Sequence, residues 1–265
     1  MHRRHLITSA LALPFLGLSG WHAYAEVSSL SDAINKAGAQ RMLSQRMGKA
    51  WLALVHGIEK TSAQQVLDKS MAVFERQLHE LTTFAPNADI KSTYTQLGTS
   101  WQDYKAQLAG AAPQKSGATA LLQQDAKVLA LAHQGTLQFE ALLGKPQGKL
   151  INLAGRQRML SQRMAKFYLA AKLPVDSAAA TQEIDKARNE FVAALSTLRH
   201  APEATARIKE ELLLADGQWV FFDMALQKLQ QSQGHPKALS EVFITSENLL
   251  SVMDNVTNLY AGVKT

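Results

Sequence analysis

The amino-acid sequence predicts an all-α protein made of two tandem antiparallel four-helix bundles. The first observation is a duplicated segment: residues 35–49 and 152–166 align without a gap, and the eight residues QRMLSQRM are identical in both copies. An identical run of this length in register indicates an internal repeat. The second observation is the spacing of apolar residues at intervals of three and four, which is typical of amphipathic helices, between turns that contain proline or glycine.

The first repeat is predicted to span residues 26–144. Its first helix covers about residues 26–60 and carries the first copy of the duplicated segment. The later helices are separated by the caps Thr61 and Ser62, the turn at residues 85–88 and the loop at residues 110–117. Residues 144–148 contain two glycines and Pro146, which argue against a continuous helix into the next repeat.

The second repeat, residues 145–265, follows the same plan. Its helices are separated by Pro174, by Ala201-Pro202 and by residues 234–236. Core residues recur in register: Phe74, Leu78 and Leu81 as Phe191, Leu195 and Leu198, and Trp101 and Tyr104 as Trp219 and Phe222. We interpret these apolar and aromatic positions as the cores of the two bundles.

Residues 1–25 have the features of a signal peptide. A basic start that includes Arg3 and Arg4 is followed by a short apolar run and by Ala23-Tyr24-Ala25, an Ala-x-Ala cleavage site. The apolar run is too short for a comfortable membrane span, so we expect cleavage before Glu26 and export to the periplasm. Ordinary Sec export is favoured, although the paired arginines also resemble a twin-arginine signal. Retention of the segment as an anchor stays open.

Composition narrows the classes of function and partner. The chain has a net charge of +6, and loss of residues 1–25 with their two arginines lowers it to +4. A mildly basic exported protein suits anions or an acidic surface, and the basic and aromatic residues are not interleaved as in nucleic-acid-binding proteins. The sequence contains no cysteine, which excludes disulfides and thiol chemistry.

The sequence shows no recognisable catalytic or cofactor motif. Glycine-rich phosphate loops, nucleophile elbows and zinc-protease motifs are all missing. The histidines beyond residue 25 are scattered singly, and each is predicted to be a surface or partner-bonded residue: His56, His79, His133, His200 and His235. We therefore expect no enzyme activity, no cofactor and no metal.

The duplicated segment has an unusual helix face. At helical spacing it carries a glycine, an arginine and a glutamine: Gly38, Arg41 and Gln45 in the first copy, and Gly155, Arg158 and Gln162 in the second. Glycine permits close approach of another helix, and an arginine at such a contact needs an acceptor. If the copies face each other, two arginines about 7 Å apart repel by about 2 kcal/mol. A small planar oxyanion between them reverses that sign.

A second pair of arginines, Arg46 and Arg163, lies about 140° around the helix and should point elsewhere. A purely structural role remains the alternative for all four arginines, with each paired to an acidic residue of a neighbouring helix. The duplication favours a shared function, because surface residues of a repeat are free to diverge.

The two copies resemble the P-box of the periplasmic sensor domain of nitrate/nitrite sensor histidine kinases. That domain is similar to the N-terminal region of type IV pilus methyl-accepting chemotaxis transducers (PilJ-type). The resemblance implies a four-helix bundle with the P-box on its first helix, and an anion bound at a two-fold interface by the first arginine after an Ala-Gly pair. That arginine corresponds to Arg41 and Arg158, and the glycine to Gly38 and Gly155. The present chain departs from those sensors, since no membrane-spanning helix or kinase follows.

We therefore predict an exported, soluble, sensor-like binding protein for a small oxyanion, held between Arg41 and Arg158. Nitrate or nitrite is suggested by the resemblance alone. The competing interpretation is a helical partner of a membrane chemoreceptor, a sensor kinase or a type IV pilus system, with no small-molecule ligand. The two copies could pair within one chain as an internal pseudo-dimer, or between the chains of a homodimer.

Overall fold

The computed structural model describes residues 26–173, 175–229 and 235–263. In this part the chain forms eight α-helices and one short 3₁₀ turn (η1, Lys115–Gly117), without a strand. The α-helices are α1 (Leu30–His56), α2 (Lys60–Phe84), α3 (Ala88–Ala109), α4 (Ala118–Leu143), α5 (Pro146–Ala170), α6 (Ser177–His200), α7 (Ala206–Gln227) and α8 (Pro236–Gly262). The predicted signal peptide, residues 1–25, lies outside the described residues.

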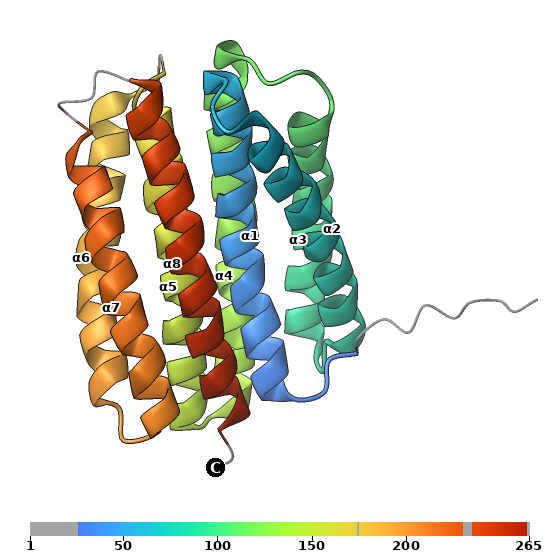
Figure 1. The fold of residues 1–265 in the computed structure, drawn as a ribbon. Coiled ribbons are helices and arrows are strands. Elements are labelled where there is room, and N and C mark those ends of the chain that lie inside the picture. The colour runs from blue at the N-terminus through green and yellow to red at the C-terminus, as the bar shows by residue number, and fades with distance from the viewer. Residues whose placement is uncertain (1–25, 174, 230–234, 264–265) are drawn as a thin grey trace, which may run out of the picture.

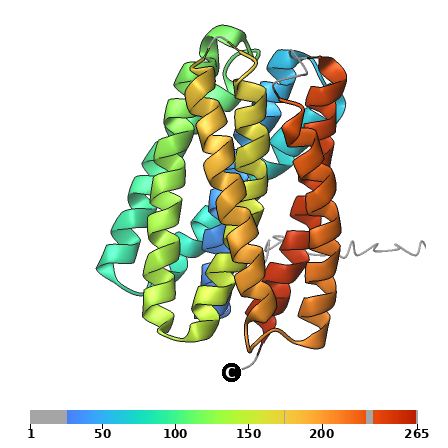
Figure 2. The same cartoon turned by 90° about the vertical axis from the view of Figure 1, so that its left-hand side faces the viewer.

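The helices form two four-helix bundles that lie side by side (Figure 1). Helices α1–α4 make the first bundle and α5–α8 the second, and a view from the side shows all of them running along roughly one direction (Figure 2). The helices that carry the duplicated segments, α1 and α5, pack along each other at the centre. The predicted all-α tandem architecture is confirmed, and the two copies pair within one chain as an internal pseudo-dimer.

Local sequence signals set the ends of α1, α4 and α5. The predicted caps Thr61 and Ser62 instead lie inside α2, which begins at Lys60 without a side-chain cap. Ser29 caps α1 by accepting a backbone hydrogen bond, and Gly57 ends the helix in the left-handed conformation, with φ of 70°. Because of these two caps, α1 is shorter at both ends than the predicted span of residues 26–60. Gly144 ends α4 with φ of 64°, and Pro146 occupies the first turn of α5. The repeats are thus joined by a break and not by a continuous helix.

The two bundles have equivalent aromatic cores. Phe74 of α2 packs on Trp101 of α3 with ring centroids 4.4 Å apart, and Phe191 of α6 packs on Trp219 of α7 at 4.5 Å. The aromatic residue three positions further along each helix, Tyr104 in α3 and Phe222 in α7, lies edge to face with the tryptophan at 6.2 Å in both bundles. This matched geometry confirms the predicted recurrence of Trp101 as Trp219 and fixes the register that relates α3 to α7.

A buried lysine in each duplicated segment ties the two bundles together. Lys166 of α5 forms an ion pair with Asp125 of α4, and both side chains are 1% exposed. Lys49 of α1 donates to Ser246 of α8 at 2.9 Å and to Glu247 at 2.6 Å. Burial lowers the pKa of both lysines. Each lysine therefore reaches from the first helix of one bundle to the last helix of the other.

Asp125→Ala is expected to destabilise the fold by about 3–5 kcal/mol, because it leaves the Lys166 ammonium group buried without a counter-charge. The double variant Asp125→Leu/Lys166→Met should recover most of this loss, since apolar side chains of similar size replace a desolvated ion pair. Urea unfolding followed by circular dichroism measures both effects. If Asp125→Ala unfolded with the same free energy as the wild type, the buried Lys166–Asp125 ion pair would not stabilise the fold.

Candidate functional site

The duplicated segments cross where a glycine of one lies against a glycine of the other. A Cβ atom added at Gly38 would lie 3.9 Å from the Gly155 Cα, and 3.3 and 3.5 Å from the Nη2 atoms of Arg41 and Arg158. A larger side chain would displace these guanidinium groups, so glycine here permits close helix approach. The crossing brings the two arginines to one place at the seam between the bundles.

Each arginine donates hydrogen bonds across the crossing to an asparagine of the opposite segment. The Arg41 Nη2 donates to the Asn152 Oδ1 at 2.7 Å and to its backbone oxygen at 3.3 Å. The Arg158 Nη2 donates to the same two atoms of Asn35, at 2.9 and 3.1 Å. Asn35 and Asn152 hold the same place in the two copies. These hydrogen bonds therefore repeat about a pseudo-two-fold axis between α1 and α5.

The symmetry breaks down at the next partner of each arginine. The Arg158 Nη1 lies 2.5 Å from the Asp254 Oδ1 of α8 and forms an ion pair. In the first bundle α4 supplies His133 instead, whose Nδ1 lies 3.2 Å from the Arg41 Nη1. Because a guanidinium only donates, that ring nitrogen accepts and the imidazole is neutral. Burial, with repulsion from Arg41 and Arg156, lowers the pKa of His133 to about 4, which keeps the ring neutral at pH 7.

Arg41 is thus a buried cation with neutral partners. Its exposed fraction is 0%, and it pairs with no carboxylate of the described residues. Glu140 is linked to it through the Asn152 amide, which donates to that carboxylate. Burial and repulsion from two neighbouring arginines lower the pKa of Arg41 to about 9, so the group stays charged at neutral pH. A desolvated cation of this kind is stabilised by an anion beside it.

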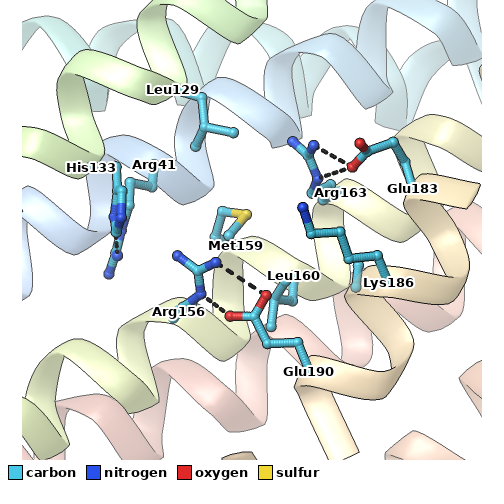
Figure 3. A pocket seen from close by; sticks show the side chains of 11 residues that line it. Arg41, Leu129, His133, Arg156, Met159, Leu160, Arg163, Glu183, Lys186 and Glu190 are labelled. Atoms are coloured by element: carbon cyan, nitrogen blue, oxygen red, sulfur yellow. Dashed lines mark hydrogen bonds and ion pairs between the residues drawn. The ribbon is translucent and has the colours of Figure 1, made fainter. Parts of the chain in front are cut away.

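A cavity of about 170 Å³ adjoins Arg41 and is lined by residues of α4, α5 and α6 (Figure 3). Its apolar walls come from Leu129, Met159, Leu160 and Ala187. Its titratable lining consists of Arg41, His133, Arg156, Arg163, Lys186, Glu183 and Glu190. Arg156 pairs with Glu190 and Arg163 with Glu183, as the dashed lines of Figure 3 mark. Arg41 and Lys186 form no ion pair within the described residues, so the cavity suits an anion.

The matching flank of the crossing, beside Arg158, differs in the pairing of its cations. A cavity of about 240 Å³ there is lined by three cationic side chains, each of which pairs with a carboxylate. The pairs are Arg158 with Asp254, Arg46 with Glu247, and Lys36 with Glu80. Ala39 occupies the place that Arg156 holds in the other copy. The two cavities therefore lie on opposite flanks of the arginine pair, and only the one beside Arg41 has a buried cation in need of a counter-charge.

The remaining predicted site residues lie around the crossing in other roles. Gln45 and Gln162 each donate to the fourth helix of their own bundle, at 2.8 and 2.9 Å. Arg46 and Arg163 point away from the arginine pair to glutamates, as their place on the helix predicts. Arg163 nevertheless lines the cavity beside Arg41.

Sequence reasoning missed Asn35, Asn152 and Asp254 as members of this site. The asparagines carry a signal that could have found them, because they are duplicated in register with the arginines. His133 was predictable only as a surface or partner-bonded residue, and its partner is Arg41. Its counterpart in the second repeat is an aspartate, Asp254, so the sequence does not reveal the correspondence. Only the fold shows that both residues lie beside an arginine.

The fold and the site together define a tandem helical domain with a buried cationic site at the seam of its two repeats. The sequence matches the family of type IV pili methyl-accepting chemotaxis transducer N-terminal domains (PilJ) over residues 23–132 and 145–242, and the chain belongs to this family. The family consists of chemoreceptor-related sensor domains and is not an enzyme family. Neither the curated proteins nor the solved structures contain a match to the sequence.

Two further properties concern the described residues. None of their helices is long and apolar enough to cross a membrane. They also contain no group of three or more histidine, aspartate or glutamate side chains that could hold a metal ion.

Stability should fall in acid as Glu247 takes up a proton. Burial raises the pKa of this carboxyl, but attraction to Lys49 and Arg46 outweighs burial and holds the pKa at about 2, against an ordinary value of 4.5. A carboxyl with a lower pKa in the folded chain stabilises the fold above pH 4.5, and this contribution is lost as the pH falls to 2. A shift of this size corresponds to about 3 kcal/mol.

Glu247→Gln should therefore lower the free energy of unfolding at pH 7 and reduce its decline between pH 4.5 and 2. Urea unfolding at a series of pH values measures both. Glu210→Gln is the matched control, because the Glu210 side chain is 64% exposed. Parallel pH profiles for Glu247→Gln and the wild type would rule out this carboxyl as a source of acid sensitivity.

Proposed function

We propose that the chain is an exported, sensor-like binding module for a small oxyanion, held by Arg41 in the cavity beside the crossing of the duplicated segments, with Arg158 on the other side of that crossing. Nitrate and nitrite are the anions suggested by the resemblance of these segments to a P-box. Export to the periplasm is supported by membership of a family whose domains are typically periplasmic.

The observation that carries the proposal is the unbalanced charge of Arg41. Its guanidinium is fully buried, and its hydrogen-bond partners, Asn152 and His133, are neutral. A charge removed from water is costly unless an opposite charge lies beside it. A small anion in the adjoining cavity provides that charge, with Arg158 adding positive potential from across the glycine crossing.

The guanidinium geometry favours a planar oxyanion. Its N–H groups lie in one plane and match two oxygens of a nitrate, a nitrite or a carboxylate. The Arg41 Nε is a buried donor without a partner among the described residues, so it is free to bind an oxygen. The cavity of about 170 Å³ exceeds the ~30 Å³ of one water molecule several-fold and has room for a small hydrated anion.

One anion per chain is the expected stoichiometry. Asp254 already neutralises Arg158, whereas its counterpart His133 leaves Arg41 without a counter-charge. The pseudo-two-fold axis therefore relates an arginine without a carboxylate partner to an arginine that has one.

A role of the arginine pair as a docking surface for another protein is disfavoured by burial. Arg41 is 0% and Arg158 2% exposed. A protein partner would have to separate α1 from α5 to reach them.

Calorimetric titration of the purified chain with nitrate, nitrite, chloride and acetate tests the proposal. Arg41→Gln should weaken the binding of nitrate or nitrite by at least ~10-fold, because it removes a charge-assisted hydrogen bond. Arg207→Gln should bind like the wild type, since the Arg207 side chain is 65% exposed. Circular dichroism verifies that each variant is folded. The proposal would be overturned if none of the four anions bound to the wild type. It would also be overturned if Arg41→Gln bound nitrate or nitrite as tightly as the wild type.

An exchange between the repeats separates charge balance from folding. His133→Asp gives Arg41 the carboxylate that Arg158 has, and should abolish anion binding while the helix content is unchanged. Asp254→His removes the carboxylate beside Arg158 and should raise the stoichiometry from one anion toward two. If both variants bind like the wild type, the charge imbalance at Arg41 does not govern binding.

A further inference from the structure

Helix α7 exposes an apolar stripe to solvent. Leu213, Leu214, Val220, Phe221 and Met224 are 54–67% exposed, although each is a large apolar side chain. With Gly217, they recur at intervals of three and four residues and therefore share one face of the helix. Figure 1 shows α7 at the outside of the second bundle, away from the seam between α1 and α5. A continuous apolar patch of this kind on a soluble protein marks an interaction site.

Helix α3 of the first bundle is an internal control for this face. The matched pairs Phe74–Trp101 and Phe191–Trp219 place α3 and α7 in the same register. In that register the outward residues of α3 are also exposed, but they are polar or small: Thr95, Gln96, Thr99, Gln102, Asp103 and Ala106. The fold therefore does not require an apolar outer face on its third helix, and the stripe of α7 is an added property of the second repeat.

The stripe is symmetric about Gly217. Leu213 and Leu214 precede this glycine by four and three residues, and Val220 and Phe221 follow it by three and four. A Cβ atom added at Gly217 would meet nothing within 4 Å, so the glycine faces open space. If a second α7 crosses antiparallel at Gly217, the leucine pair of each helix lies against the Val-Phe pair of the other. This is the self-complementary arrangement of a two-fold interface.

The charged residues beside the stripe are consistent with a second copy of α7 as the partner. Arg188 pairs with Asp223, and Arg199 pairs with Asp216, so these two cations are neutralised within the chain. Lys209, one turn before Leu213, is exposed and forms no ion pair within the described residues, but it is a single lysine and not a basic cluster. An anionic membrane surface would instead favour unpaired lysines and arginines next to the apolar face.

We propose that α7 is a self-association surface, on which a second copy of this chain docks antiparallel about Gly217. The stripe covers three helical turns, about 18 Å, which is a small interface. The dimer should therefore be weak, with dissociation in the micromolar range. This inference is independent of the proposed anion site, which lies at the seam between the bundles.

Sedimentation velocity of the purified chain over a range of concentrations tests the proposal. The wild type should pass from monomer to dimer, and the variant that carries the α3 residues, Leu213→Thr/Leu214→Gln/Val220→Gln/Phe221→Asp, should stay monomeric. Leu137→Gln on α4 is the matched control, since Leu137 is also exposed, and it should dimerise like the wild type. Circular dichroism should show equal helix content in all of them.

A single introduced cysteine tests the crossing point, because the sequence contains no cysteine. Gly217→Cys should form a disulfide-linked dimer under mild oxidation, whereas Thr99→Cys, at the matched place on α3, should not. A wild-type monomer at all concentrations would overturn the proposal. Equal crosslinking of both cysteine variants would do the same. Binding to vesicles of phosphatidylglycerol and phosphatidylcholine without dimerisation would assign the stripe to a membrane instead.

Discussion

The close crossing of α1 and α5 at Gly38 and Gly155 is the constraint on which the rest of the structure depends. Without side chains at this point, each helix comes near enough for an arginine of one to donate to the backbone and side chain of an asparagine of the other. The same approach brings the buried lysines further along within reach of the opposite bundle. One geometric condition thus accounts for a polar seam inside an otherwise apolar core.

Fusion of two repeats in one chain permits different residues at equivalent positions on the two sides of the pseudo-two-fold axis. In a homodimer every substitution appears on both sides of the axis. Here the last helix of each repeat has diverged, so that His133 faces one arginine and Asp254 the other. Arg156 likewise stands opposite an alanine in the other copy. A symmetric pair of arginines is thereby set between two flanks of different charge balance, and the same freedom to diverge extends to the outer faces of α3 and α7.

Much of the architecture could be predicted from the sequence, because it rests on local signals. Helical periodicity, the break at Gly144 and Pro146, and the duplicated octet predict helices in two repeats. The end of α1 at Gly57 was missed, because the apolar pattern continues past this glycine. The meeting of Arg41 and Arg158 also followed from the repeat, once the two glycines were taken as a contact face. The partners contributed by α4 and α8 could not be predicted, since their register is looser than the offset of the duplicated segments. The exposure of the apolar stripe of α7 could not be predicted either, because apolar residues at helical spacing ordinarily belong to the core.

The lysine ties have a consequence for how the chain acquires its structure. Lys49 pairs with Glu247, which lies 198 residues later in the chain, and Asp125 of the first repeat pairs with Lys166 of the second. The N-terminal half on its own would therefore bury a carboxylate with no ammonium group opposite, while the C-terminal half would lack the lysine that lies against Glu247. Such long-range pairing raises contact order and delays completion of the core until both halves are present. A chain of this kind acquires its native state as one cooperative unit, even though it is built from two copies of a bundle.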